Sequence, residues 1–486
     1  MPRIRLGVVL ASVCLLSGCL VGPRYQRPVV TAPPVFRGQE GEAQKASIAD
    51  LPWWEIFQDE ALRGLIKTAI ANNNDLRIAA ARVEQARQFA RQARSDYFPG
   101  VGYEVGASGG KNESLGAPAL SGGKTQGTVA AVLGASWEAD VWGRIRRSNE
   151  YALARYLGTE QGRRGVLLSL VSGVAQAYLE LLELDLRLEI AHRNVNSFQG
   201  SLKIFEERLN AGTASRLETA RAQAALATTA AAIPELERRI AIQENQIRIL
   251  LGSAPGPIPR QRTLLEQTLP PEVPAGLPSS LLERRPDVLE AEAAVHAANA
   301  QVGIAAAAVF PKIGLTALFG RISSPLADLT AGRMSLWSVA ATAAGPIWEG
   351  GGIRAQKRQA VAVWEQARIG YEQTVLGAFR DVSNALITRE KLEGVRARQV
   401  EAVKAYQDAV EVSLKRYAAG KSGYFEVLEV QQQLVPAENA LAQTELDRRL
   451  VIVQLYQALG GGWNLSNPGW SGPPAAPQPP PPNPNP

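Results

Sequence analysis

The sequence predicts an internally duplicated α+β membrane protein in which very long helices alternate with two pairs of β-strands. Three observations support this fold class. A short Gly/Ser-containing helix break occurs twice, two pairs of segments alternate apolar with small or polar residues, and the spacings between these features match in the two halves of the chain. Matched intervals of this kind indicate an internal repeat. We therefore expect most of the chain to be one structural pattern present twice.

The repeated helix break is a short stretch between two Ala-, Leu-, Glu- and Gln-rich helical segments. It reads Arg208-Leu-Asn-Ala-Gly-Thr-Ala-Ser-Arg-Leu-Glu218 in the first half and Arg416-Tyr-Ala-Ala-Gly-Lys-Ser-Gly-Tyr-Phe-Glu426 in the second. Glycine tolerates the left-handed backbone that ends a helix, and Ser215 or Ser422 is expected to cap the helix that follows. Each copy is predicted to form the tip of a helical hairpin.

The N-terminus has the pattern of a secretory signal peptide, predicted over residues 1–18. Arg3 and Arg5 precede an apolar run from Leu6 to Leu16 that is too short to span a bilayer as a helix. The run ends in Leu-Ser-Gly-Cys19, which resembles the bacterial lipobox and implies cleavage before Cys19 and acylation of that residue. Several acyl chains on one residue would anchor stably. The alternative is an ordinary signal peptide with an accidental cysteine.

The segment after the lipobox, residues 19–50, is predicted to be a lipidated, extended tether. Leu20 stands where aspartate would signal retention in the inner membrane, so the outer membrane is favoured. Four prolines and the absence of periodicity favour an extended chain. The folded body is expected to begin at Leu51-Pro-Trp-Trp-Glu-Ile-Phe57, whose aromatic residues are interpreted as packing groups.

The body divides into a first structural repeat (51–252), a Pro-rich linker (253–278), a second structural repeat (279–465) and a Pro-rich tail (466–486) that is predicted to be disordered. Each repeat contains two segments of about ten residues in which apolar residues alternate with small or polar ones. Length and period match transmembrane β-strands, and a soluble hairpin is the alternative. The alternating residues are Val101, Tyr103, Val105 and Ala107; Val129, Ala131, Leu133, Ala135 and Trp137; Ile313, Leu315, Ala317 and Phe319; and Trp337, Val339, Ala341 and Ala343.

Helical periodicity returns after the first strand pair and holds from Arg144 to Leu209. A helix of this length would reach ~100 Å, far beyond an ordinary globular helix. Beyond the tip, residues 213 to 251 form the returning helix, with a kink expected at Pro234. Gly420 lies 72 residues beyond Trp348, and Gly212 lies 70 residues beyond Trp142, so the second half repeats the long helix.

The composition gives no sign of catalysis or of a bound cofactor. The chain has two cysteines, both near the N-terminus, and two isolated histidines, His192 and His296. No nucleophile–base arrangement, phosphate loop or metal-ligand spacing is present, so we predict no enzyme, no metal and no cofactor. The net charge of +6 comes from acids and bases that interleave along helices, which excludes a nucleic-acid patch.

Four strands do not close a barrel, and an open sheet edge in hydrocarbon leaves backbone groups unsatisfied. Other copies of the chain must therefore complete the barrel. Known single-chain barrels begin at about eight strands, so two copies are the minimum and three, with twelve strands, are plausible.

The ordered set of features is similar to the TolC-like outer-membrane factors. These features are the lipobox, the Trp53-Trp54-Glu-Ile-Phe-Gln-Asp59 segment, the Phe98-Pro99 and Phe310-Pro311 strand starts and the two Arg-x-x-x-Gly tips. More narrowly, they resemble the lipoprotein branch (the NodT/OprM group) that serves RND-type efflux pumps. The resemblance covers residues 15 to 465. It implies a homotrimer with a twelve-stranded barrel in the outer membrane and a long α-helical barrel crossing the periplasm. The implied partners are a periplasmic adaptor, or membrane fusion protein, and an inner-membrane RND-type transporter.

The function expected from this resemblance is an exit duct for small molecules that opens by rearrangement of the hairpin tips. Being the helix ends far from the lipid, the tips are expected to form the periplasmic mouth. The residues expected at the adaptor-docking surface are Gly212, Thr213, Ala214, Ser215, Gly420, Lys421, Ser422 and Gly423. Candidates for links that hold the mouth closed are Arg208, Arg416, Tyr417 and Tyr424. Alternatives are the outlet of a type I protein-secretion system, whose members generally lack the lipobox, and a structural coiled-coil lipoprotein without a pore. The cargo is not readable from the sequence.

Overall fold

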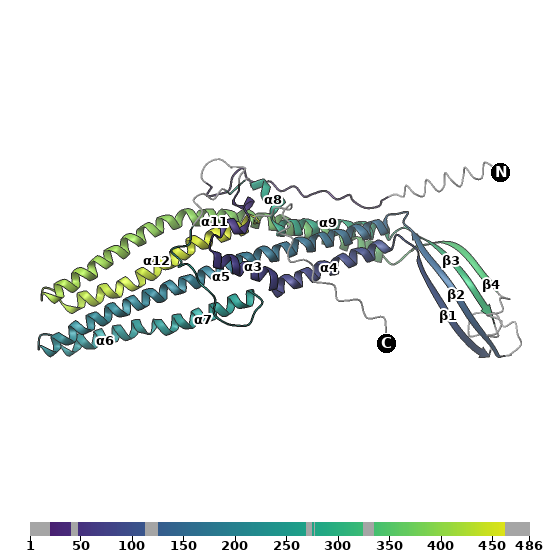
Figure 1. The fold of residues 1–486 in the computed structure, drawn as a ribbon. Coiled ribbons are helices and arrows are strands. Elements are labelled where there is room, and N and C mark those ends of the chain that lie inside the picture. Colours follow the sequence, from purple (N-terminus) through teal and green to yellow (C-terminus); the bar gives the residue numbers. More distant parts are fainter. Residues whose placement is uncertain are drawn as a thin grey trace. The chain divides into compact units, whose positions relative to one another are not determined.

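The computed structural model describes residues 20–39, 47–111, 125–268, 275–276, 278–323 and 335–461. Its elements are labelled in Figure 1. The chain forms two compact units. Unit 1 comprises Met1–Val29, Arg82–Glu160 and Glu290–Glu372, and unit 2 comprises Val30–Ala81, Gln161–Leu289 and Gln373–Pro486. Each unit therefore draws on both halves of the chain. The signal peptide, Cys19 and the Pro-rich tail lie outside the described residues.

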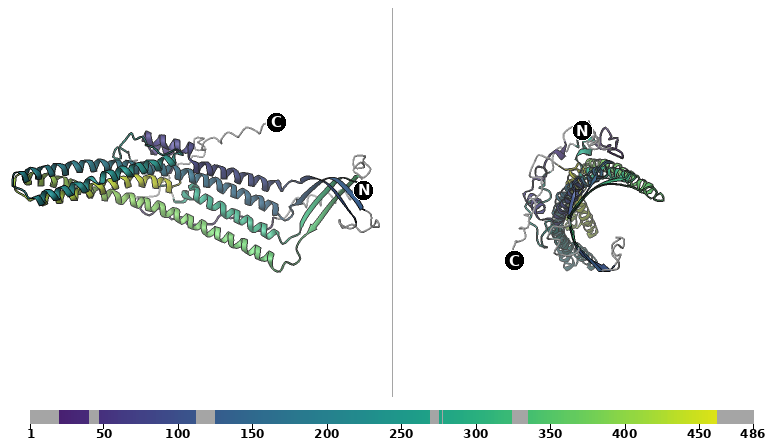
Figure 2. Two further views of the ribbon diagram at one scale, coloured as in Figure 1. Left: turned by 90° about the horizontal axis from the view of Figure 1, so that it is seen from below. Right: turned by 90° about the vertical axis from the view of Figure 1, so that its right-hand side faces the viewer.

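Unit 1 contains a four-stranded antiparallel sheet with the strands in chain order (Figure 1). The strands are β1 (Gly100–Lys111), β2 (Thr125–Ala139), β3 (Lys312–Ser323) and β4 (Ser335–Ala344). Both predicted strand pairs are confirmed, and pairing between β2 and β3 joins the two halves of the chain. The four strands lie side by side in Figure 2 as well.

The register of the sheet brings the alternating apolar residues onto one face. Tyr103 is opposite Leu133, Leu133 is opposite Phe319, and Phe319 is opposite Trp337, so a row of large apolar side chains crosses all four strands. These side chains are exposed in the single chain, Tyr103 by 81%. A wide apolar face that none of the described residues covers is the property expected of strands that face lipid.

The long helices begin beyond the strand pairs and are equal in length. Helices α5 (Arg144–Asn210) and α11 (Gly352–Ala418) each contain 67 residues, which confirms the predicted long helix and its repetition. By length and composition α5 contains a window apolar enough to cross a membrane, but 67% of that window is buried inside the protein. Burial of this extent is typical of a core helix.

The returning helices differ between the two halves. In the first half the return consists of α6 (Arg216–Ala230) and α7 (Ala232–Leu250). They meet at Ala231, three residues before Pro234, because proline lacks an N–H group and clashes with the preceding turn. The returning helix is thus interrupted close to Pro234, where the kink was predicted. In the second half α12 (Tyr424–Ala458) is continuous and contains Pro436.

The other helices frame the strands and the start of the body. Helix α4 (Asn74–Ser95) ends shortly before β1, and α9 (Pro286–Ala307) ends shortly before β3, as the two Phe-Pro pairs predict. The shorter elements are η1 (Ile48–Asp50), α2 (Trp53–Ile56), α3 (Glu60–Asn72), η2 (Pro278–Ser280) and α8 (Leu281–Arg284).

Unit 2 buries part of the aromatic segment that opens the folded body. Trp53 is 4% exposed, and Phe57 meets the ring of Tyr456 edge-on at 6.5 Å between centroids. Asp59 accepts a hydrogen bond from the Leu62 N–H and so caps α3. These contacts agree with the packing role predicted for the aromatic residues.

Candidate functional site

The two predicted tips are helical turns at the ends of α5 and α11, and both lie at the same end of unit 2 (Figure 2). Each long helix ends at a glycine with a left-handed backbone, Gly212 at φ 73° and Gly420 at φ 69°. The next N–H donates back across the turn, from Thr213 to the Arg208 carbonyl and from Lys421 to the Arg416 carbonyl, both at 2.9 Å. The predicted helix ends are confirmed at both positions.

The cap of the returning helix is a side chain in only one tip. Ser215 Oγ accepts a hydrogen bond from the Glu218 N–H at 3.4 Å, as predicted. Ser422 does not cap α12: the N-cap is Gly423, and among the described residues Ser422 Oγ is buried without a hydrogen-bond partner. The prediction for Ser422 is wrong because the cap is the third residue after the glycine in both tips, and the third residue after Gly420 is Gly423.

The tips present small and polar residues at the surface. Ala214 and Ser422 are half-buried, and the other residues proposed for adaptor docking are exposed: Gly212, Thr213, Ser215, Gly420, Lys421 and Gly423.

A contact between Arg208 and Tyr417 joins the two hairpins. The Arg208 guanidinium lies over the Tyr417 ring at 4.5 Å from the centroid, a cation–π contact between α5 and α11. Tyr417 is 3% exposed and meets the Phe205 ring edge-on at 4.9 Å. Its hydroxyl donates to Glu218 Oε2 at 3.5 Å. Burial raises the pKa of this hydroxyl and the Glu218 carboxylate raises it further, although Arg208 opposes the shift. Tyr417 therefore remains a neutral donor.

A second contact between the hairpins involves Tyr424 and an arginine that sequence reasoning missed. Arg221 Nη1 donates to the Tyr424 hydroxyl at 2.7 Å, joining α6 to α12. Arg221 was indistinguishable from the many other exposed arginines of the helices. Arg416, in contrast, stays within its own tip and donates to the Lys421 carbonyl at 3.4 Å. The structure therefore brings together Arg208 with Tyr417 and Tyr424 with Arg221.

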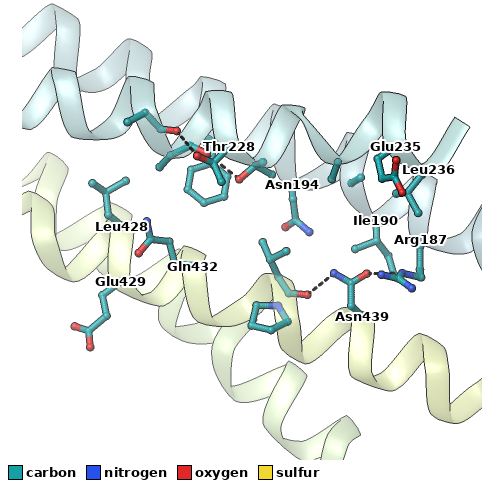
Figure 3. Close-up of a pocket in the computed structure, with 18 of the residues that line it drawn as sticks. Arg187, Ile190, Asn194, Thr228, Glu235, Leu236, Leu428, Glu429, Gln432 and Asn439 are labelled. Atoms are coloured by element: carbon teal, nitrogen blue, oxygen red, sulfur yellow. Dashed lines mark hydrogen bonds between the residues drawn. The ribbon is translucent and has the colours of Figure 1, made fainter. Parts of the chain in front are cut away.

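A groove of about 640 Å³ lies beside these contacts, between the two hairpins of unit 2. Figure 3 shows its walls, with Arg187 on α5, Thr228 on α6, Leu236 on α7 and Leu428 on α12. Arg187 Nε donates to Asn439 Oδ1 at 3.2 Å across one end of the groove. The lining is mixed, with apolar residues between a few charged and amide groups.

Buried polar contacts continue along the groove and join α5 to α12. Glu438 is 4% exposed and accepts hydrogen bonds from Arg193 and Asn194, both at 2.9 Å. Two helical turns nearer the tip, Gln431 Nε2 donates to Ser197 Oγ at 2.9 Å. Fully paired buried groups of this kind hold two helices in one register.

The described residues contain no group of three or more His, Cys, Asp or Glu side chains placed to hold a metal ion. The side chains at the tips form packing contacts and hydrogen bonds between helices.

A family model described as outer membrane efflux protein matches residues 65–253 and 277–461 of the chain. The cation efflux system protein CusC of Escherichia coli O6:H1 is 33% identical over 456 residues, which cover 92% of this chain and 96% of that protein. The solvent efflux pump outer membrane protein SrpC of Pseudomonas putida is 35% identical over 464 residues, covering 94% and 98%. The solved structure of the outer-membrane channel OprN superposes with a TM-score of 0.86 at 30% identity, covering 92% of this chain and all of that one.

Proposed function

The chain belongs to the outer membrane efflux protein family, and from that premise we propose that it is the exit duct of a tripartite efflux pump. The observation that carries the proposal is the four-stranded sheet with one apolar face, continued by two 67-residue helices that end in linked tips. The sheet supplies a wall that fits the outer membrane. The helices supply a wall long enough to extend into the periplasm.

The working form is a homotrimer. Within the described residues β1 and β4 pair on one side only, so each protomer has two open sheet edges. Each unsatisfied backbone group in hydrocarbon costs several kcal/mol, and barrels remove the cost by closing. Pairing β4 of one copy with β1 of the next closes the sheet, and three copies give the twelve strands expected of this family. Cys19 is the proposed lipid anchor, which would hold the N-terminus at the outer membrane.

The tips form the periplasmic mouth and dock the adaptor. Their exposed small residues let another helical end approach the backbone closely, and Lys421 supplies a charged contact. An inner-membrane RND-type transporter would deliver small molecules through the adaptor. That transporter, rather than this chain, would select among cations, solvents and drugs.

Opening is a shift between two packings of the hairpins. The Arg208–Tyr417 and Arg221–Tyr424 contacts favour the packing seen in the structure. Contact with the adaptor would favour the other packing, because a partner shifts such an equilibrium only by binding one state more tightly. Arg208, Tyr417 and Tyr424 are thus proposed as mouth-closing links, together with Arg221, whereas Arg416 shapes its own tip.

Single-channel recording in planar bilayers tests this function. We expect the wild-type trimer to conduct weakly and the double variant Arg208→Ala/Arg221→Ala to be open about tenfold more often. The factor follows from the loss of roughly 1–2 kcal/mol in a cation–π contact and a charged hydrogen bond.

The charge-matched control is Arg238→Ala/Arg398→Ala. In the described part of the chain these two exposed arginines pair within their own helices, with Glu235 and Glu401. The control should conduct as the wild type does. A monomeric protein that never conducts would overturn the duct and favour a structural lipoprotein, and equal opening of both double variants would overturn the links.

A further inference from the structure

The first described residues of the chain are docked rather than free. We call Leu20–Arg27 the strap. It runs along the start of α5 and the body of α9, all within unit 1. The Val21 N–H donates to the Trp142 carbonyl at 3.2 Å, and Asn299 Nδ2 donates to the Pro23 carbonyl at 3.1 Å. The sequence predicts only an extended tether in this region, because an irregular strap leaves no periodic signal.

A buried arginine binds the backbone of the strap. Arg147 is 2% exposed, and its guanidinium donates to three successive carbonyls, those of Val21 and Gly22 at 3.4 Å and that of Pro23 at 2.8 Å. Its Nη1 also pairs with Glu150 at 2.7 Å, which balances the buried charge. A guanidinium with five donors in a fixed plane suits this combination of carbonyls and carboxylate.

Two glycines make the crossing of strap and helix possible. Gly22 has φ 98°, and a Cβ on it would lie 2.6 Å from the Gly303 Cα of α9. A Cβ on Gly303 would in turn lie 2.7 to 2.8 Å from three atoms of Arg147. Strap, helix and arginine are therefore in contact with no space for another carbon atom. An incidental surface contact would not need two glycines at one crossing.

The far end of the strap is fixed by side chains. Tyr25 stacks on His296 at 4.4 Å between ring centroids and donates its hydroxyl proton to Glu292 Oε1 at 3.1 Å. Arg27 pairs with Glu292 at 2.9 Å. His296 Nε2 lies 3.0 Å from Glu150 Oε1, so the side-chain cluster continues to the Arg147 partner. Burial raises the pKa of the Tyr25 hydroxyl, and the Glu292 carboxylate raises it further.

The near end of the strap lies at the junction between strand and helix. A Cβ on Gly143 would lie 2.6 Å from Leu20 Cδ1, so Leu20 rests directly on the turn between β2 and α5. Beside it, the Trp142 ring stacks on Phe310 at 4.6 Å, and Trp142 Nε1 donates to the Pro311 carbonyl at 2.8 Å. The strap thus ends where the apolar sheet begins.

The residues around this junction fit a lipid–water interface. At the same ends of the strands, Phe98 is 66% exposed, Trp348 is 86% exposed and Ile347 is fully exposed. Aromatic residues gather at the level of the lipid headgroups, where their rings are half solvated. These exposed apolar side chains directly precede β1 or follow β4, the two outer strands of the sheet with the apolar face, so the occupant that they fit is the membrane surface.

We propose that the strap is a positioning device for the lipid anchor. Cys19 is one residue from Leu20, and neighbouring Cα atoms are about 3.8 Å apart. Docking therefore fixes the point at which the acyl chains leave the protein, beside its own strands and at the level of their periplasmic ends. A released strap of eight residues could extend by about 25 Å. The lipid attachment point would then no longer be held at the level of the periplasmic ends of the strands. Arg147 acts as a positioning residue, and the inference rests on the lipid attachment at Cys19 proposed above.

Docking is tested by trypsin on the full-length, detergent-purified protein. The bond after Arg24 lies inside the strap, whereas Arg27 is protected by the following proline. Cleavage after Arg24 shortens the chain to a new start at Tyr25, which mass spectrometry detects. We expect Arg147→Ala and Gly303→Ala to speed this cleavage about tenfold over wild type. The control Arg155→Ala removes an exposed arginine of the same helix. Among the described residues its partner is Tyr151, and the variant should leave the rate unchanged.

The positioning role is tested by a double-mutant cycle on insertion into vesicles of phosphatidylethanolamine and phosphatidylglycerol. Cys19→Ser and Arg147→Ala should each slow insertion by a similar factor, and the double variant should be no slower than Cys19→Ser. A merely structural arginine would instead give multiplied effects, because independent sites add in free energy.

The outcomes separate this inference from the proposed function. Three results would each overturn the positioning device. They are multiplied effects in the double-mutant cycle, unchanged trypsin cleavage in both Arg147→Ala and Gly303→Ala, and a wild-type mass without acyl groups. None of these results bears on conductance, which tests the duct separately. Gly303→Ala keeps Arg147 and its charge, so a result shared by the two variants is not explained by the loss of the arginine's charge.

Discussion

Two glycines three residues apart in the second tip have different roles. Gly420 ends α11 in the left-handed region at φ 69°, whereas Gly423 is the N-cap of α12 at φ −82° with an extended backbone. A Cβ on Gly423 would meet no atom within 4 Å. The first position requires glycine for its backbone, and the second tolerates a side chain that accepts hydrogen bonds.

The same substitution should therefore have opposite effects at these positions. We expect Gly420→Ser to destabilise the tip by roughly 1–2 kcal/mol, the cost of a left-handed residue with a Cβ. Gly423→Ser should stabilise it by a few tenths of a kcal/mol, because serine caps better than glycine. Hydrogen exchange of the Glu426 amide reports both changes. Equal exchange rates in the two variants would contradict these roles.

Some residue-scale features could be predicted from the sequence and others could not. Gly212, Gly420 and Ser215 could be, because their roles depend on local backbone chemistry. Predicting that Ser422 does not cap α12 would have required the position of the turn to within one residue. Arg147 and Arg221 could not be found, because their partners are far away in the chain and their neighbours in sequence look like any solvated helix.

At the scale of the element, α12 contains buried polar residues seven positions apart. Gln431, Glu438 and Glu445 are all less than 5% exposed. Seven residues are two helical turns, so the three side chains lie along one stripe of the helix. The sequence predicts the helix from its composition, but charged residues on such a pattern look solvated until the partner helices are known.

Among the three residues of this stripe, Glu445 has the most arginine partners. Arg448 and Arg449 donate to its Oε2 at 3.0 and 2.8 Å, and Arg396 donates to Oε1. Burial alone would raise the pKa of this carboxyl, but hydrogen bonds from Arg396 and Arg449 outweigh burial and hold the pKa below its usual value of 4.5. The carboxylate is therefore needed to balance the buried Arg449.

Removing that charge should destabilise the helix packing. We expect Glu445→Gln to lower the free energy of unfolding by about 3 kcal/mol, because Arg449 would remain buried without its counterion. Thermal unfolding in detergent measures the change. Glu411→Gln is the control, since Glu411 pairs with Lys415 on an exposed surface and should change nothing measurable.

The same carboxylate predicts a dependence on pH. A carboxyl whose pKa is lower in the folded state contributes stability above its unfolded pKa and loses it as the pH falls through the folded pKa. The wild type should therefore lose stability below about pH 4.5, and Glu445→Gln should lose less over that interval. Parallel pH profiles for the two proteins would contradict this assignment.

At the scale of the whole molecule, the two faces of the sheet meet different surroundings in the proposed barrel. Phe319 belongs to the apolar row, whereas Thr316 lies three positions earlier on the opposite face, between Ser136 and Ala340. Alternation along a strand places one face against lipid and the other toward the lumen.

An arginine should therefore be tolerated on one face only. We expect Phe319→Arg to cost about 2–4 kcal/mol in the membrane and to reduce the amount of inserted trimer. Thr316→Arg should insert normally and alter ion selectivity in bilayer recordings. If both variants inserted equally well, the apolar face would not be facing lipid.

The architecture was predictable because periodicity encodes it. The strand pairs, the 67-residue helices and the duplication all follow from spacing within the chain, which needs no long-range knowledge. The mixing of both halves in each compact unit, the docked strap and the groove between hairpins depend on contacts across hundreds of residues. Periodicity also does not give the number of copies in the assembly. The open sheet edges require neighbouring copies, but they do not fix how many.

The equal length of α5 and α11 constrains how such a chain changes during evolution. The contacts of Arg208 with Tyr417 and of Arg221 with Tyr424 require the two tips to be level. Seven residues inserted into one long helix alone would displace its tip by ~10 Å and separate these pairs. Length changes are therefore tolerated only when they occur in both halves together. The two copies of the duplicated segment are therefore constrained to keep the same length. A lineage with a wider or narrower periplasm would have to lengthen or shorten both long helices together.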